Sequence, residues 1–365
     1  MRVLIAASGT GGHIIPALSV ARVLKKREPT ATFMTLSSEH SVGRKLWDHS
    51  VGDWKTLPIQ SWPKGDQWLS PTYWAKQGQT AVTTRKILKE FQPQVVVGFG
   101  GSASGPAVAF ARWMKIPTAI HEQNVFPGRS TRWLSRLANR VAVTFEETKR
   151  HLPRKTIIKV TGIPIRPGLG LPSRKQALQK LKLSPDLPVL LVTGGSQGSR
   201  RINRVVIETL ELLKPAQRKL FQVLHLAGSR DTLWVKEMHE ELKIQGQVHP
   251  VLDRMDLAYA AATLSVTRAG AATLGELIAT TTPAVLVPYR YADGHQVVNA
   301  QWLASRGGAL NLDETAMSPD RFLETVLPLM GDAHRLDVMK KNLKKLQTSN
   351  AAESLADLIQ EIAAR

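Results

Sequence analysis

Short runs of apolar residues recur along the whole chain, each followed by a polar or glycine-rich segment and then by a helical stretch. Uninterrupted apolar runs of this length predict strands that are buried on both faces, and their alternation with helices predicts parallel sheets. Strands are expected at Arg2–Ala7, Thr32–Leu36, Gln94–Phe99, Thr118–His121, Val141–Thr144, Val189–Thr193, Val223–Ala227, Leu264–Thr267 and Ala284–Val287. The pattern therefore predicts an α/β protein.

Helical periodicity between these strands predicts helices at Ala17–Lys26 and Val82–Phe91, and helix throughout residues 334–365. Pro16 is expected in the first turn of the first helix, where the missing N–H group would have had no partner in any case.

A passage rich in proline and glycine, between Thr161 and Pro172, interrupts the pattern near the middle of the chain. The strand–helix alternation starts again after it, so we expect two doubly wound, Rossmann-like domains that face a cleft. The expected parts are an N-terminal domain at 1–160, an interdomain linker at 161–185, a C-terminal domain at 186–340 and a C-terminal helix at 341–365. That last helix is expected to pack back on the N-terminal domain.

Composition and charge exclude some kinds of site and favour others. The 365 residues include no cysteine, which excludes disulfides, thiolate nucleophiles and cysteine-bound zinc. The formal charge of +20 is uneven, because residues 1–165 carry a net +15 and residues 166–365 a net +5. This asymmetry is compatible with solubility alone, but it favours an anionic partner such as nucleic acid, phospholipid head groups or a phosphorylated substrate. No apolar run approaches the roughly 18 residues of a membrane span, so we expect the chain to stay on the cytoplasmic side.

Four glycine-rich loops follow predicted strands, and glycine lets backbone N–H groups approach an anion at the start of a helix. The four loops are Gly9–His13, Gly98–Pro106, Gly194–Ser199 and Arg268–Leu277. One such loop is also typical of an ordinary turn, but four of them together favour binding of a phosphate or a sugar nucleotide.

A dinucleotide oxidoreductase is disfavoured, because the pattern G-x-G-x-x-G fails at Ile14 in the first loop and at Ser196 in the third. No glycine loop ends in the Gly-Lys-Ser/Thr of a P-loop. A basic nucleic-acid-binding protein remains the alternative outside enzymes, although the chain has no recognisable zinc finger or RNP motif and the loops would stay unexplained.

The motifs together resemble the MurG family of bacterial N-acetylglucosaminyltransferases. The matching segments, in family order, are Gly9–His13 with Pro16-Ala17, Gly100–Pro106, His121–Asn124, Thr161–Arg166, Gly194–Gly198, Arg268–Ala271 through Glu276, and Asp293–Ala300. The resemblance implies a GT-B fold, with an acceptor-binding N-terminal domain and a nucleotide-sugar-binding C-terminal domain. The implied reaction transfers GlcNAc from UDP-GlcNAc to the 4-hydroxyl of undecaprenyl-diphospho-MurNAc-pentapeptide (lipid I), with inversion, to give the lipid II of peptidoglycan synthesis.

Four positions depart from the family pattern. Serine stands at Ser8 where glycine is usual, at Ser102 where tyrosine is common and at Ser199 where alanine is common, and Ile163 replaces a usual asparagine. These departures affect the fine details of the sugar contacts and leave the reaction class unchanged.

Many glycosyltransferases use a metal held by Asp-x-Asp, a spacing that no pair of aspartates in this chain has. We therefore expect no metal and no cofactor, and amides, helix dipoles and arginine must relieve the charge on the departing UDP. Arg166 and Ser196 are the candidates for the diphosphate, while a salt bridge in the linker is the alternative role of Arg166.

The remaining donor contacts are expected around the glycine loops. Glu276 is the candidate for the ribose hydroxyls, although it would also complement a helix N-terminus. The family's uracil contact falls on Leu252, which by periodicity alone would be core. The full set expected to bind UDP-GlcNAc is Thr10, Gly11, Gly12, Asn124, Arg166, Ser196, Leu252, Ala271, Ala272, Thr273, Leu274, Glu276, His295 and Gln296.

His13 is our candidate for the general base, because a histidine titrates near neutral pH and this one lies in the first glycine loop. A structural hydrogen bond is its alternative role, and Glu122 is the reserve base. His121 ends an apolar strand and is expected to be structural. The residues expected to hold the diphosphate of the acceptor are Gly11, Gly12, Gly100, Gly101 and Ser102.

Aromatic and cationic residues alternate between Trp62 and Phe91, as is typical of a surface that lies against anionic lipid. The aromatic and aliphatic members are Trp62, Trp68, Tyr73, Trp74, Ile87, Leu88 and Phe91, the cations are Lys64, Lys76, Arg85, Lys86 and Lys89, and Trp113 and Lys115 lie outside the stretch. Burial of the aromatic residues in the core is the alternative.

The sequence thus predicts an inverting, metal-independent transferase that is bound peripherally to the cytoplasmic face of the inner membrane. Its expected partners are UDP-GlcNAc, lipid I, the anionic membrane and other cell-wall synthesis proteins, and no nucleic acid is expected. A related GT-B enzyme with another acceptor, such as a glycolipid synthase, is the second enzyme hypothesis.

Overall fold

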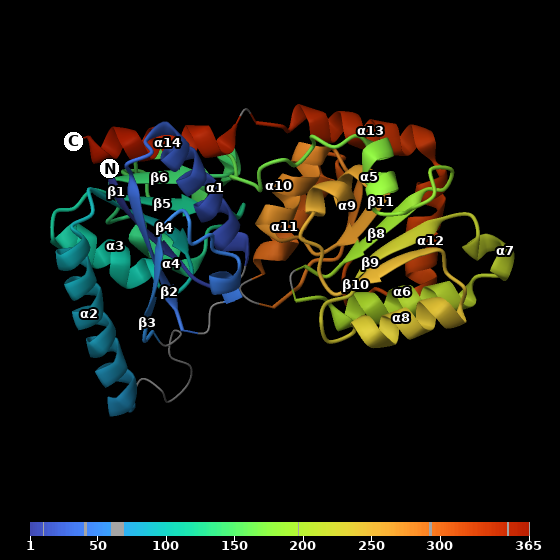
Figure 1. Ribbon diagram of the computed structural model, residues 1–365, viewed down its shortest axis with the longest axis horizontal. Helices are drawn as coiled ribbons and strands as arrows, with labels where there is room; N and C mark the ends of the chain where they lie inside the picture. Colours follow the sequence, from blue (N-terminus) through green and yellow to red (C-terminus); the bar gives the residue numbers. More distant parts are fainter. Residues whose placement is uncertain are drawn as a thin grey trace. The chain divides into compact units, whose positions relative to one another are not determined.

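Two parallel β-sheets organise the chain, and each is covered by helices on both faces (Figure 1). The computed structural model describes residues 1–9, 11–39, 42–59, 69–195, 197–291, 294–348 and 350–364. The first unit consists of Met1–Arg166 and Thr348–Arg365, and the second of Pro167–Gln347.

The first unit is built on a seven-stranded sheet in the order β3-β2-β1-β4-β5-β6-β7. Its strands are β1 (Arg2–Ala7), β2 (Thr32–Ser38), β3 (Asp53–Leu57), β4 (Val95–Gly100), β5 (Thr118–Glu122), β6 (Arg140–Val143) and β7 (Ile158–Val160). Its helices are α1 (Gly11–Arg27), α2 (Pro71–Phe91), α3 (Ser104–Trp113), α4 (Arg129–Leu134) and α14 (Ala351–Ala363), with short 3-10 helices at Val42–Lys45 and Glu146–His151.

The second unit repeats this plan on a six-stranded sheet in the order β10-β9-β8-β11-β12-β13. Its strands are β8 (Val189–Thr193), β9 (Gln222–Leu226), β10 (Gly246–His249), β11 (Leu264–Thr267), β12 (Ala284–Leu286) and β13 (Ala309–Asn311). Its helices are α5 (Arg174–Lys180), α6 (Arg200–Leu212), α7 (Pro215–Arg218), α8 (Thr232–Glu241), α9 (Met255–Ala261), α10 (Ala271–Thr280), α11 (His295–Ala304), α12 (Pro319–Gly331) and α13 (Ala333–Lys345).

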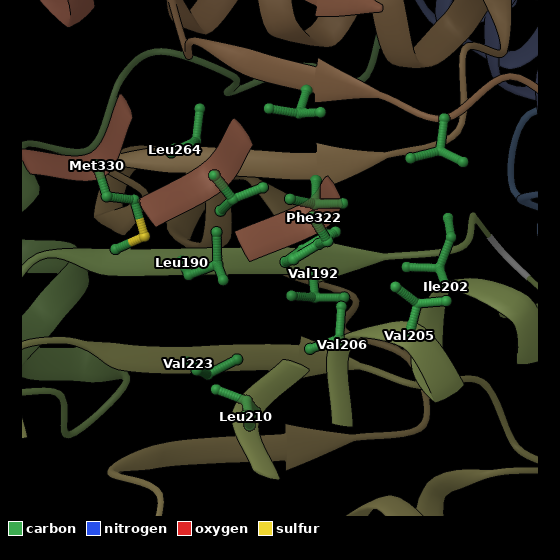
Figure 2. Close-up of a cluster of buried hydrophobic side chains, with 14 of the residues drawn as sticks. Leu190, Val192, Ile202, Val205, Val206, Leu210, Val223, Leu264, Phe322 and Met330 are labelled. Carbon is green, nitrogen blue, oxygen red and sulfur yellow. The ribbon is translucent and has the colours of Figure 1, made fainter. Parts of the chain in front are cut away.

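The predicted strands match the sheets because their side chains are buried on both faces. All five residues of β8 and all five of β9 are buried, and Leu190, Val192 and Val223 pack with Val206 and Phe322 from helices on one face of the second sheet (Figure 2). Burying one such side chain contributes about 1.5–3 kcal/mol. Four strands were not predicted from the sequence, namely β3, β7, β10 and β13, and these are short or partly exposed strands without a continuous apolar run.

The helix boundaries differ from the prediction in two places. Helix α1 begins at Gly11, so Pro16 lies inside the helix and not in its first turn. Helix α2 begins at Pro71, where the Ser70 side chain accepts a hydrogen bond from the N–H of Tyr73 and caps the helix.

Residues 334–365 form two helices, which belong to different units. Helix α13 is part of the second unit, whereas α14 packs along α1 in the first unit, and Leu355 and Ile359 enter the core of that unit. Arg27 of α1 forms ion pairs with Glu353 and Asp357 of α14. A single helix at 341–365 was therefore the wrong description.

The expected linker at 161–185 also differs from the structure. The chain passes from the first unit to the second after Arg166, and α5, at Arg174–Lys180, packs against α9 inside the second unit. Ser173 and Gln176 form a capping box at its start, which explains why a helix follows so soon after the proline-rich passage.

Candidate active site

The first unit has its topological switch point between β1 and β4, because the chain runs from β1 outward through β2 and β3 and returns to the other side of β1. The loops after these two strands lead into α1 and α3, and ligands of doubly wound sheets bind at such a point. The N–H of Ser8 donates to the carbonyl of Gly100 and so joins the two loops. The first two predicted glycine loops therefore lie side by side.

His13 lies in the first turn of α1, just beyond the loop in which the sequence placed it. Its Nδ1 donates to the carbonyl oxygen of Ser8 at 2.7 Å, which leaves Nε2 as the acceptor atom of the ring. A side-chain carbon at Gly100 would lie 2.8 Å from that Nε2, so only glycine leaves room for the imidazole there. The ring is partly exposed and faces the second glycine loop.

Two serines that depart from the family pattern interact with each other in this loop pair. Ser8 Oγ and Ser102 Oγ share a hydrogen bond of 3.3 Å, and Ser8 Oγ also accepts from the N–H of Ala103 at 3.2 Å. Gly101 has φ +75°, and a side-chain carbon there would lie 2.3 Å from both oxygens of Ser8. Hydroxyl contacts thus stabilise the approach of the two loops in this chain.

His121 has a structural position, as predicted from the apolar strand that it ends. The ring is 2% exposed, its Nε2 lies 3.0 Å from the carbonyl of Gly162, and its Nδ1 lies 3.1 Å from the amide nitrogen of Gln123. Burial lowers the pKa of His121 to about 4, so the ring is neutral near pH 7.

Glu122, the reserve base, is buried with both carboxylate oxygens engaged. Its Oε1 accepts from the backbone N–H and the side-chain amide of Asn124, and its Oε2 accepts from the N–H of Gly128, which caps α4. Thr148 donates to the carbonyl of Asn124. This arrangement fixes the loop after β5 and gives Glu122 a structural role in the first unit.

The second unit has its switch point between β8 and β11, and the third and fourth glycine loops follow these strands. Gly194 lies against the backbone N–H of Ser199, where a side-chain carbon would approach to 2.1 Å. Gly198 has φ +74° and lies against the carbonyl of Ala227. These close approaches make the glycines necessary for the loop. Ser196, in this loop, and Thr10, in the first loop, lie outside the described residues.

Helix α10 begins at Ala271, within the range predicted for the fourth loop, with Gly270 as its N-cap residue. Ala271, Ala272, Thr273 and Leu274 form its first turn, and Glu276 follows in the second turn. Glu276 is buried, and its Oε2 accepts a hydrogen bond of 3.0 Å from the hydroxyl of Tyr259 on α9. The carboxylate is therefore held in a fixed orientation near the start of the helix.

The structure brings the described donor residues of the second unit to the carboxyl edge of one sheet. Leu252 follows β10 and is half-buried, and His295 and Gln296 begin α11 after β12. The other residues predicted for the donor, which are Gly11, Gly12, Asn124 and Arg166, belong to the first unit. Arg166 is the last residue of that unit before the chain crosses to the second.

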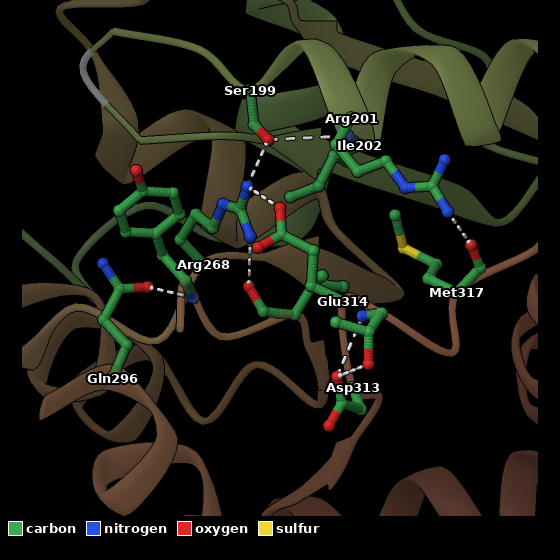
Figure 3. A network of polar contacts seen from close by, with 11 residues as sticks. Ser199, Arg201, Ile202, Arg268, Gln296, Asp313, Glu314 and Met317 are labelled. Atoms are coloured by element: carbon green, nitrogen blue, oxygen red, sulfur yellow. Dashed lines mark hydrogen bonds and ion pairs between the residues drawn. The ribbon is translucent and has the colours of Figure 1, made fainter. Parts of the chain in front are cut away.

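Arg268 is a residue to which the sequence assigned no role beyond its place in a motif. Its guanidinium contacts the Ser199 hydroxyl at 2.7 Å, the Val287 carbonyl at 3.1 Å and the Glu314 carboxylate (Figure 3). A charged residue directly after a buried strand is the signal that could have singled it out.

Only part of the predicted membrane surface is exposed. Tyr73, Ile87 and Leu88 are buried, and Ile87 and Leu88 of α2 belong to a core cluster of the first unit. Trp74 is 53% and Trp113 65% exposed, and Arg85 lies over the Trp113 ring at 5.3 Å. The exposed cations of α2 and α3 include Lys76, Lys86, Lys89 and Arg112, and Leu69 and Val82 are exposed apolar residues. Trp62, Lys64 and Trp68 lie outside the described residues, and no described helix is long and apolar enough to cross a membrane.

Two family models match the chain. The glycosyltransferase family 28 N-terminal domain matches residues 3–143, and the glycosyltransferase family 28 C-terminal domain matches residues 189–359. Relatives from Halothermothrix orenii and Streptomyces coelicolor are each 34% identical, and the alignments cover 100% of this chain and 99% of each relative. Both are named UDP-N-acetylglucosamine--N-acetylmuramyl-(pentapeptide) pyrophosphoryl-undecaprenol N-acetylglucosamine transferase.

Solved structures agree with these relatives. The crystal structure of Acinetobacter baumannii MurG is 27% identical and has a TM-score of 0.78 over 99% of both chains. A kitacinnamycin glycosyltransferase, 17% identical with a TM-score of 0.69, shares the fold. The predicted GT-B class with two Rossmann-like sheets is confirmed. The chain therefore belongs to glycosyltransferase family 28 and, within it, to the MurG family of N-acetylglucosamine transferases.

Proposed function

We propose that this chain transfers N-acetylglucosamine from UDP-GlcNAc to the 4-hydroxyl of lipid-linked MurNAc-pentapeptide, which makes lipid II for peptidoglycan synthesis. The observation that carries the proposal is the 34% identity, over 99% or more of both chains, to relatives named for this transfer. The two switch points support it, because each offers glycine loops and a helix N-terminus to a phosphorylated substrate.

The acceptor binds the first unit in this proposal. The backbone of Gly11 and Gly12 in the first turn of α1, with the loop of Gly100, Gly101 and Ser102, receives its diphosphate. His13 is the general base, since its Nδ1 donates to the Ser8 carbonyl, and in that tautomer Nε2 is the ring atom that takes the proton of the attacking 4-hydroxyl. Glu122 has its two oxygens engaged within its own loop, which favours His13 over the reserve.

The donor binds mainly the second unit. Glu276 accepts hydrogen bonds from the ribose hydroxyls, the backbone at Leu252 reads the uracil edge, and Gln296 with His295 holds the sugar. Ser196 and Arg166 bind the diphosphate, and Asn124 contributes to the sugar contacts. For the described residues, these roles are consistent with a place at the carboxyl edge of a sheet or in the segment that joins the units.

Bond breakage leaves negative charge on the departing UDP. The N-termini of α6 and α10 both lie at the carboxyl edge of the second sheet, where their dipoles favour that charge. With Arg166 they supply the stabilisation that a metal supplies in other transferases. Direct attack of the acceptor hydroxyl, with the proton passing to His13, inverts the anomeric carbon.

The enzyme acts as a peripheral protein at the cytoplasmic face of the inner membrane in this proposal, where it meets the lipid-linked acceptor and other cell-wall synthesis proteins. The exposed indoles of Trp74 on α2 and Trp113 on α3, together with the exposed cations of the same two helices, form the proposed contact with anionic lipid.

Release of UDP from UDP-GlcNAc by the purified protein, with and without a soluble lipid I analogue, tests the proposal. We expect release only when the acceptor is present, and much less with UDP-GalNAc or UDP-glucose as donor. Donor binding without acceptor-dependent release would keep the fold and point to another acceptor. Absence of binding to any UDP-sugar would contradict the proposal.

A further inference from the structure

Four loops at the carboxyl edge of the second sheet converge on the side chain of Arg268. The residue itself follows β11, Ser199 follows β8, Val287 follows β12 and Glu314 follows β13. The guanidinium donates to the Ser199 hydroxyl at 2.7 Å and to the Val287 carbonyl at 3.1 Å, and it pairs with Glu314 (Figure 3). One side chain thus links the loops that follow β8, β11, β12 and β13.

Glu314 orients the Arg268 guanidinium through their ion pair. The side chains of Arg268 and Glu314 are only 11% and 14% exposed, so the pair is largely removed from solvent. A charge pair in such a place is costly to assemble and still more costly to break, because removal of one partner leaves the other buried and uncompensated. Its presence is therefore better explained by the geometry that it imposes than by a gain in stability.

The network reaches the proposed sugar-binding residue through Tyr289. The guanidinium carbon lies 5.4 Å from the centre of the Tyr289 ring, and the backbone N–H of Tyr289 donates to Oε1 of Gln296 at 3.0 Å. The side-chain oxygen of Gln296 is thereby held by the backbone of Tyr289, and the NH₂ group of the same amide takes no part in this contact. Movement of Arg268 would shift both Ser199, at the end of the phosphate loop, and Gln296.

We propose that Arg268 is a positioning residue, which sets the spacing between the loop that binds the diphosphate of the donor and the residues that bind its sugar. This inference rests on the proposed function, because it names a role within the same donor site. Arg268 acts through Ser199 and Gln296 and is not placed against the substrate.

Arginine suits this role for a chemical reason. Its planar guanidinium presents donors in fixed directions to several acceptors while an aromatic ring packs against its face. A lysine at the same place keeps the charge, but its single ammonium cannot reproduce the fork between Ser199, Val287 and Glu314. The substitution Arg268→Lys therefore separates charge from geometry.

The test compares three variants of the full chain by titration with UDP and with UDP-GlcNAc, by KM and kcat with a soluble acceptor, and by thermal unfolding. Arg268→Lys keeps the charge, and the double variant Arg268→Gln with Glu314→Gln removes the ion pair without leaving an unpaired charge. Arg290→Lys is the matched control, since Arg290 forms an exposed pair of 3.7 Å with Asp313 in the same two loops.

We expect Arg268→Lys and the double variant to raise the KM and Kd for UDP-GlcNAc by about ten-fold or more, because small misplacements of binding groups are costly. The Kd for UDP should rise less, since UDP lacks the sugar that Gln296 contacts. Arg290→Lys should leave all of these values unchanged.

A purely structural role would lower the melting temperature and the amount of active enzyme while KM and Kd stay at their wild-type values, and this result would overturn the inference. Loss of affinity for UDP and for UDP-GlcNAc by the same factor would also overturn it, because the link to the sugar would be absent. A wild-type chain that binds no UDP-sugar would instead contradict the proposed function itself.

Discussion

His13 and His121 interact electrostatically, yet the structure gives them different chemistry. The His13 ring is partly exposed, with Nδ1 fixed on the Ser8 carbonyl, whereas His121 is buried with both nitrogens next to polar partners. Burial lowers the pKa of His121 and keeps it neutral, so it stabilises the sheet edge and has no access to a substrate. Exposure and the hydrogen bond at Nδ1 make His13 the better candidate for the base.

Replacement of His13 by alanine should lower kcat by about 10²- to 10⁴-fold, the range that a general base contributes, and leave the Kd of UDP-GlcNAc almost unchanged. Acceptor-dependent UDP release and titration with the donor measure the two quantities. His49→Ala, at an exposed histidine of the same unit, is the control. Normal turnover of the His13 variant would remove it from the role of base.

Replacement of Glu276 by alanine should raise the Kd for UDP-GlcNAc by about 10- to 100-fold, because hydrogen bonds to a charged group contribute about 1.5–3 kcal/mol. The measurement compares UDP with 2′-deoxy-UDP. Wild type should prefer UDP, and the variant should bind both nucleotides equally. Tyr259→Phe, which removes only the neighbouring hydroxyl, should keep the preference for UDP. A preference that survives in Glu276→Ala would refute the ribose contact.

At the scale of elements, a buried polar chain joins β9 to the two helices on the same face of the sheet. Nδ1 of His225 on β9 lies 3.3 Å from Nε2 of His239 on α8, and its Nε2 lies 3.1 Å from Oδ1 of Asn203 on α6. Asn203 also donates to the carbonyl of Ala227, which supports the loop against Gly198. Burial lowers the pKa of His239 to about 4 and that of His225 well below its usual value.

These depressed pKa values predict that acid destabilises the second unit. Below pH 6.5 the unfolded chain binds protons on these histidines while the folded chain excludes them, so stability falls as the pH drops from about 6.5 towards 4. His239 alone should contribute a loss of about 2 kcal/mol between pH 7 and pH 5. Urea unfolding of wild type and of His239→Gln at both pH values measures it.

The His239→Gln variant should lose less stability on acidification than wild type, whatever its stability at pH 7. His334→Gln, at an exposed histidine of the same unit, should behave as wild type. An equal loss in wild type and in His239→Gln would contradict the assignment.

Helices α2 and α3 carry the proposed lipid contact, and the double variant Trp74→Ser with Trp113→Ser tests it. Loss of two exposed indoles should weaken binding to vesicles that contain anionic lipid by about ten-fold or more, measured by co-sedimentation, while the Kd of UDP-GlcNAc stays unchanged. Trp234→Ser, at a partly exposed tryptophan of the second unit, is the control. Unchanged vesicle binding in the double variant would exclude this surface.

At the scale of the whole molecule, the chain crosses between the units twice, after Arg166 and again before Thr348, so that α14 completes the first unit. Met1 and Ala363 pack against the same core cluster, and both ends of the chain lie in the first unit (Figure 1). Each unit has its own buried core and its own switch point. This division fits a transferase in which one unit binds the acceptor and the other the donor.

Excess EDTA should leave acceptor-dependent UDP release largely intact, because helix N-termini and arginine stabilise the leaving group in the proposed mechanism. The assay uses enzyme dialysed against the chelator, with added Mg²⁺ as the comparison. Loss of activity that Mg²⁺ restores would mean that the chemistry depends on a metal.

Features that are local along the chain follow from the amino-acid sequence alone. Continuous apolar runs such as Val189–Thr193 predict buried strands, and glycine loops after them predict where substrates bind, because both signals depend on neighbouring residues. Strands without such a run were missed, as β10 shows, since its pairing with β9 and not its composition makes it a strand.

Features that join distant residues depend on the packing of the folded chain. Tyr73 and Trp74 are neighbours in the sequence, yet in the folded chain the first is 7% and the second 53% exposed. The role of Arg268 depends on Ser199 and Glu314, which lie 69 and 46 positions away. Such partners meet only when a parallel sheet brings the carboxyl ends of its strands to one edge, and no local pattern records which of them will touch.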